Sequence, residues 1–225
     1  MKKSLSLIIC VLFVTVVLHA QNYTVAHGSD EHITNDIHYP KAVGVKGTQT
    51  AEFKLENIAT APGCAAYFDR TSTVFEVKAG DIITPSVTIN GAWMHSFIFV
   101  DWSQNGQFEV NLLGDGPYTE GEGNELVSYS HYNMASSTVN NGWNSAGEAV
   151  GGNVLTPCTF RVPAHLAVGS SYRMRYSVTW NCARPDGDYP NFISDGGSII
   201  DVTLKIVGVA ENVQKYPIDN YEEPS

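Results

Sequence analysis

The stretch Tyr172-Arg-Met-Arg-Tyr-Ser-Val-Thr-Trp180 alternates an apolar side chain at every even position with a polar one at every odd position. A period of two is typical of a β-strand that has one face in a core and the other toward solvent. Residues 200–206 alternate in the same way. Both segments therefore predict strands that are buried on one face.

Other segments complete the β pattern. The apolar run Phe97-Ile-Phe-Val100 lacks alternation and predicts a central strand buried on both faces. Residues 73–78 and 86–90 are shorter β-rich runs, and no window holds a sustained helical period. Strands joined by turn-rich connections predict an all-β fold, a single antiparallel β-sandwich with long loops.

The first twenty residues have the parts of a cleavable signal peptide. Lys2 and Lys3 precede an apolar stretch over residues 5–18, and the small residue Ala20 follows. That stretch is shorter than the roughly 20 residues of a membrane-spanning helix, and no second one follows. We therefore expect a secreted protein, periplasmic or extracellular, without a membrane span.

The chain is acidic, and its charge limits its partners. Removing the signal peptide removes Lys2 and Lys3, which leaves 11 of the 13 basic residues against 23 acidic ones, a net charge of −12. Phosphate groups attract Lys and Arg, so this balance argues against nucleic acid as a partner. It is compatible with cation binding.

Three cysteines remain after residue 20, and their spacing matches no zinc pattern. Cys158 and Cys182 flank a predicted hairpin, and a disulfide between them is possible in an oxidising compartment. Three buried free thiols are the alternative.

The segment Asp101-Trp-Ser-Gln-Asn-Gly-Gln-Phe-Glu109 places oxygen-bearing side chains at every second position, and Gly106 permits a sharp turn. Calcium loops have this pattern, because calcium takes six to eight oxygen ligands. The predicted ligands are Asp101, Ser103, Asn105, the Gln107 carbonyl and Glu109, completed from a distance by Glu122 and Glu125, because Leu112 stands where a bidentate Glu is expected. A hairpin turn at Asn105-Gly106, which needs no metal, is the alternative.

Residues 130–152 are rich in Asn, Ser and Gly and predict a long surface loop around Trp143. An exposed Trp can stack on the apolar face of a sugar while nearby polar side chains bond its hydroxyl groups. The predicted ligand-binding residues are Trp143, Asn141, Asn144 and Tyr132. A loop that folds back and buries Trp143 is the alternative.

Three stretches resemble the motifs of GEVED domains, which are β-sandwich modules of secreted bacterial proteins. The run from Phe97 to Phe108 is similar to the family's "I-D-W-N-x-D-G-x-F" signature, and residues 160–175 resemble its "F-x-(V/I)-P … G-x-x-R-(M/L)-R". Residues 195–202 stand where the G-E-V-E-D-Y run falls, with Gly197 and Asp201 matching. Ser198 and Ile200 replace its two glutamates. The resemblance implies a sandwich and an accessory role beside glycosidases or peptidases.

These observations divide the chain into a signal peptide (1–20), an N-terminal strand or irregular segment that packs on the domain (21–50), a GEVED-like sandwich (51–208) and a polar tail (209–225). No G-x-S-x-G, H-E-x-x-H or phosphate-binding loop occurs. We therefore expect no enzyme, but a secreted binding module for carbohydrate, stabilised by calcium. The alternatives are a surface scaffold or adhesin-like protein that binds other proteins, and a small carbohydrate-active hydrolase or lyase that uses the carboxylates of residues 120–125.

Overall fold

A computed structural model describes residues 23, 25–27, 39–59, 66–92, 94–110, 125–131, 142–150, 154–179, 192–193 and 197–211. In this part of the chain all regular structure is β, and no helix long and apolar enough to cross a membrane occurs. The strands are β1 (Ala26–His27), β2 (Tyr39–Gly47), β3 (Phe53–Glu56), β4 (Ala66–Ala79), β5 (Ile82–Asn90), β6 (His95–Val100), β7 (Leu126–His131), β8 (Gly142–Asn144), β9 (Ala149–Val150), β10 (Phe160–Arg161), β11 (Ser171–Thr179), β12 (Phe192–Ile193) and β13 (Ser198–Val209).

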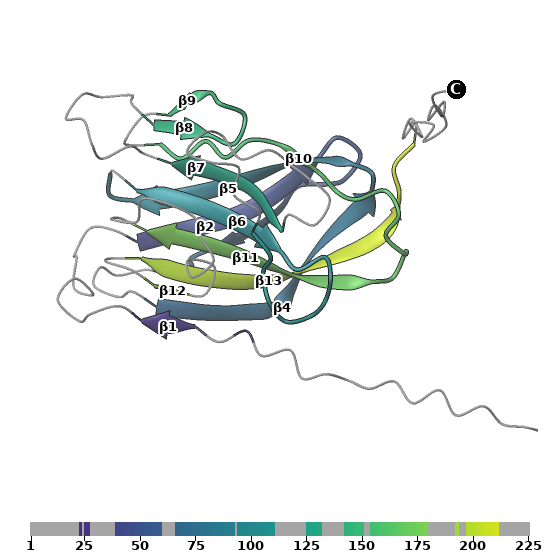
Figure 1. Ribbon diagram of the computed structural model, residues 1–225, viewed down its shortest axis with the longest axis horizontal. Helices are drawn as coiled ribbons and strands as arrows, with labels where there is room; N and C mark the ends of the chain where they lie inside the picture. The colour runs from purple at the N-terminus through teal and green to yellow at the C-terminus, as the bar shows by residue number, and fades with distance from the viewer. Residues whose placement is uncertain are drawn as a thin grey trace, which may run out of the picture.

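The strands form a β-sandwich, which confirms the predicted fold class (Figure 1). One sheet has the order β10-β5-β2-β3, and the other has the order β4-β13-β11-β6-β7-β8-β9. A separate parallel pair joins β1 to β12. The larger sheet is antiparallel except where β4 runs parallel to β13.

The main core lies between the two sheets and follows the sequence alternation. The even residues of β11 point into it, as do alternate residues of β6 and β13. The hydroxyl group of Tyr176 crosses this core and donates a hydrogen bond to the carbonyl oxygen of Gly44, at 2.9 Å. A buried tyrosine needs such a partner, and this bond ties β11 to β2 of the opposite sheet.

The second face of β11 is also buried, which corrects the prediction of one solvent-facing side. Arg175, Ser177 and Thr179 are at most 1% exposed. A second apolar cluster lies on this outer face of the larger sheet, and its Phe108 ring is 4.9 Å from the Arg175 guanidinium. The members of the cluster are Phe97, Phe99, Phe108, Leu126 and Tyr129. The alternation of apolar and polar residues predicted strand β11, but it did not predict that side chains cover its polar face. The predicted two-sided burial of residues 97–100 is confirmed.

Strand β2 lies inside the smaller sheet, between β5 and β3, so residues 39–47 are part of the sandwich rather than a segment packed on it. Its small residues allow close packing. A Cβ atom at Gly44 would lie 2.6 Å from the carbonyl oxygen of Phe53 on β3. Because this strand contains Gly44 between Val43 and Val45, its hydrophobic pattern is weak.

The turn after β2 closes around Asp81, which is 1% exposed. Its carboxylate accepts hydrogen bonds from the hydroxyl groups of Thr48 and Thr50, at 2.5 and 2.7 Å, and from the backbone amides of Gln49 and Ile82. Burial alone would raise the pKa of Asp81, but these donors outweigh it and hold the pKa below its usual value.

Asp81→Asn should lower the free energy of unfolding at pH 7 by about 1–3 kcal/mol, because an amide cannot accept all four bonds. The depressed pKa means that the wild-type carboxylate stabilises the fold above its usual pKa of 3.8 and loses this effect as the pH falls through the lower, folded-state pKa. Urea unfolding of both proteins between pH 7 and pH 3 measures this. A difference that stays constant over this range would contradict the role of the charge.

Candidate functional site

The loop that follows β6 folds around the carboxylate of Asp101, which is fully buried. Four donors reach this carboxylate: the Tyr23 hydroxyl (2.5 Å), the Gly106 amide (2.9 Å), the Ser103 hydroxyl (3.0 Å) and the Asn105 amide (3.3 Å). Each carboxylate oxygen accepts two of them, which fills its lone-pair positions. Asp101 therefore fixes the path of its own loop.

Two residues of this loop have left-handed backbone angles. Gly106, the sixth residue from Asp101, has φ +86°, a conformation that glycine adopts at little cost. Gln104 has φ +57°, and its side chain donates to the Ser171 carbonyl at 2.7 Å. The sharp turn expected at Gly106 is therefore present.

Glu125 closes the base of the loop and is 2% exposed. Its carboxylate accepts hydrogen bonds from the amides of Ser103, at 2.9 Å, and Glu109, at 2.8 Å. Its own amide donates to the Glu109 carbonyl. Burial raises the pKa of Glu125, the two amides oppose this shift, and the nearby charge of Asp101 adds to it. Glu125 therefore lies beside the Asp101 loop, and its predicted role as a distant metal ligand stays a prediction.

The remaining predicted ligands lie on the surface of the loop or outside the described residues. The Asn105 side chain accepts from the Gln107 amide and donates to the Glu109 carboxylate, so these exposed residues hold one another. Glu122 lies outside the described residues. Within the part of the chain that the structure describes, no three His, Cys, Asp or Glu side chains are grouped to hold a metal ion.

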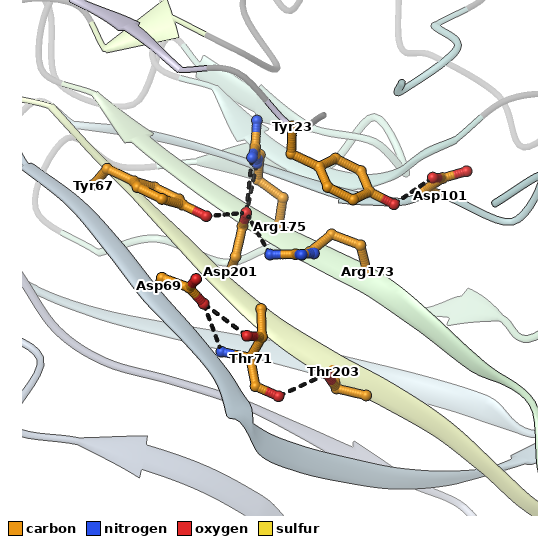
Figure 2. A network of polar contacts seen from close by, with 9 residues as sticks. All are labelled: Tyr23, Tyr67, Asp69, Thr71, Asp101, Arg173, Arg175, Asp201 and Thr203. Atoms are coloured by element: carbon orange, nitrogen blue, oxygen red, sulfur yellow. Dashed lines mark hydrogen bonds and ion pairs between the residues drawn. The ribbon is translucent and has the colours of Figure 1, made fainter. Parts of the chain in front are cut away.

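Behind this loop, on the outer face of the larger sheet, an ion pair is fully buried (Figure 2). The Asp201 carboxylate on β13 accepts two hydrogen bonds from the Arg175 guanidinium on β11, each 2.7 Å long. It also accepts bonds from Arg173, at 3.2 Å, and from the Tyr67 hydroxyl, at 2.9 Å. Burial and the Asp201 charge raise the pKa of Tyr67 to about 12.

Tyr23 connects this ion pair to the Asp101 loop. Figure 2 shows its hydroxyl group directed toward Asp101. The Arg173 guanidinium lies 4.4 Å from the centre of its ring, and the Arg175 guanidinium lies 4.9 Å from the ring of Phe108. The rings of Tyr23 and Phe108 are 5.5 Å apart. Aromatic faces attract cations, so the two rings cover the arginines favourably.

The predicted sugar-binding segment is not a plain loop. Its described part is a hairpin of β8 and β9 that extends the larger sheet beyond β7. Trp143 lies in β8, where its backbone pairs with His131 and Ala149. Asn141 and Tyr132 lie outside the described residues.

Asn144 does not fit the predicted role of a sugar ligand, because it is 1% exposed and uses all its polar atoms. Its amide nitrogen donates to Glu148 and to the Thr156 carbonyl, and its oxygen accepts from the amides of Ala146 and Glu148. These are the four hydrogen bonds that an asparagine side chain can make. Asn144 therefore builds the hairpin turn and fastens it to residues 154–159.

Cys158 is a free thiol in the structure, next to the Ser145 hydroxyl. Its predicted partner, Cys182, lies outside the described residues, so the disulfide stays a prediction.

The sequence reasoning missed Tyr23 and the ion pair at Asp201. A signal for the pair exists: Arg173 and Arg175 share one face of a predicted strand, and Asp201 stands on the next one. No such signal exists for Tyr23, which comes from a segment without periodicity.

Comparison with models of known protein families finds no match, and no curated protein sequence matches the chain.

Asp201→Asn should lower the free energy of unfolding by about 3–5 kcal/mol, because it leaves the buried Arg175 charge without its counter-charge. Urea denaturation measures this loss. Asp69→Asn is the matched control. Asp69 is exposed, and among the described residues its carboxylate accepts side-chain and backbone hydrogen bonds from Thr71 alone, so the loss should stay below about 1 kcal/mol. Equal losses in the two variants would contradict the importance of the ion pair.

Proposed function

We propose that this chain is a secreted, non-catalytic binding module whose ligand is carbohydrate and whose Asp101 loop is stabilised by calcium. One observation carries the calcium part of the proposal. Asp101 and Glu125 are buried carboxylates, and in the described part of the chain neither has an ion-pair partner. Burial raises the pKa of Glu125, and the nearby charge of Asp101 adds to this shift.

Buried charges of one sign without a counter-ion cost free energy, and a bound cation would remove that cost. Calcium suits the loop because it prefers oxygen ligands and flexible geometry. The four donors of Asp101 already occupy its lone pairs, so calcium coordination requires that a cation replace one of them. The Ser103 hydroxyl is the donor we propose, because its oxygen lies 3.0 Å from the carboxylate and both oxygens could then contact one cation. The other described residues of the proposed site are Asn105, Gln107, Glu109 and Glu125. Glu122, which lies outside the described residues, is also proposed as a ligand.

The carbohydrate part of the proposal depends on the hairpin. The hairpin ends the larger sheet, and Trp143 lies in β8, the strand next to the edge strand β9. We propose Trp143, with Asn141 and Tyr132, as the sugar-binding residues, since aromatic rings stack on sugars and polar side chains bond their hydroxyls. Asn144 is not among them. The GEVED-like motifs support an accessory role, and membership of that family is part of this proposal.

Calcium at about 100 times its Kd should raise the Tm of the mature chain by about 5–10 °C over a chelator, because it binds the folded state only. Glu125→Gln should lose most of this difference, since it removes one of the two buried charges. Differential scanning calorimetry measures both.

Asp81→Asn is the control for that experiment: it also neutralises a buried carboxylate, yet it should keep the full difference between calcium and chelator. A wild-type Tm that does not respond to calcium would refute the metal site. An equal response in Glu125→Gln would place the metal elsewhere.

A glycan array probed with the mature chain should show binding to a defined glycan class, and Trp143→Ala should reduce it at least tenfold while changing Tm little. Loss of one stacked ring accounts for such a factor. No binding to any glycan would overturn the carbohydrate assignment and favour a protein partner. A large fall in Tm for Trp143→Ala would show that this ring stabilises the fold instead.

A further inference from the structure

Tyr23 is the third residue after the predicted cleavage bond between Ala20 and Gln21. It nevertheless makes contacts far along the chain: its hydroxyl donates to Asp101, and its ring lies against Arg173 and Phe108. It is half-buried by these groups. The first residues of the mature chain therefore belong to the packed structure.

The same segment is held at a second point. β1, only three residues after Tyr23, pairs in parallel with β12, where Ala26 lies opposite Phe192. In the view of Figure 1, β1 lies at the lower side of the molecule, and β1 and β12 form a two-stranded sheet separate from the two sheets of the sandwich. The start of the mature chain is thus held at two points, by Tyr23 at the Asp101 loop and by the pairing of β1 with β12.

An uncleaved signal peptide restricts this docking. Three residues span at most about 11 Å, so Tyr23 stays that close to Ala20 while residues 5–18 are held in the membrane. Docking would then require the outer face to touch the membrane surface. The mature chain carries a net charge of −12, which an anionic membrane surface repels.

We propose that residues 23–27 form a latch that closes over the Arg173, Asp101 and Phe108 surface only after signal cleavage, so that the fold is completed once the chain leaves the membrane. This proposal rests on the secretion part of the proposed function and is independent of calcium and carbohydrate. The uncleaved chain then has the same sandwich but lacks the contacts of Tyr23.

The test compares the full chain, expressed in a bacterium with its own signal peptide, with an Ala20→Leu variant in which the small residue needed for cleavage is absent. Tyr23→Ala is introduced into both. Limited proteolysis gives a cleavage rate for the released, cleaved protein and for the tethered protein on spheroplasts. In each background, the rate of the Tyr23→Ala variant is divided by the rate of its parent, and the two ratios are compared.

In the cleaved background Tyr23→Ala should speed proteolysis about tenfold or more, because it removes a hydrogen bond to a charged group and a cation–π contact. In the tethered background the ratio should stay near one. Tyr23→Phe, which keeps the ring and loses only the hydroxyl group, should show the same difference between backgrounds with a smaller factor.

Tyr67→Phe is the matched control, because its hydroxyl group donates to Asp201 and its position does not depend on the N-terminus. It should speed proteolysis by the same factor in both backgrounds. An equal effect of Tyr23→Ala in both backgrounds would overturn the latch. A mature N-terminus that begins after Tyr23 would also overturn the latch. A chain that keeps residues 1–20 would overturn both the latch and the secretion part of the proposed function. The calcium and glycan experiments would be unaffected by either result.

Discussion

The carboxylate of Asp201 accepts hydrogen bonds from Arg175, Arg173 and Tyr67, and through them it joins β13 to both of its neighbours, β11 and β4. A buried ion pair of this kind is stable only when its polar atoms are satisfied and water is excluded. The outer face of the larger sheet must therefore be covered, although its strands carry polar residues there. The second apolar cluster and the Tyr23 ring provide this cover.

That requirement extends to the Asp101 loop. Phe108, a residue of the loop, lies over Arg175, and Tyr23 lies over Arg173 while its hydroxyl group reaches Asp101. The loop is thus held at Asp101 and Glu125 by its own backbone amides and from below by the covered arginines. The conformation of the loop therefore depends on the packing of the sheet. A cation would bind a loop whose backbone is already held by these contacts.

The sequence predicted the sandwich because alternation and the run at residues 97–100 are local patterns. It did not predict that β11 is buried on both faces, because Arg175 becomes a core residue only through a partner on another strand. Asn144 failed as a ligand for a related reason: an Asn beside a Trp suggests sugar binding, whereas the same side chain satisfies a hairpin turn completely. Glu125 lies at the base of the Asp101 loop, where its carboxylate accepts two backbone amides, and its role as a metal ligand stays a prediction.

The packing also restricts where a ligand can meet the described part of this protein. One face of the larger sheet forms the core with the smaller sheet, and much of the other is covered by the chain's own side chains. At one edge, β4 breaks its register with β13 between Asp201 and Thr203, where Asp69 accepts two hydrogen bonds from Thr71. An irregular edge pairs poorly with another strand. The opposite edge is the β8–β9 hairpin, whose turn is held by the four hydrogen bonds of the Asn144 side chain. Trp143 lies in β8, next to the edge strand β9, and neither strand contains a register break or a described residue of the second apolar cluster.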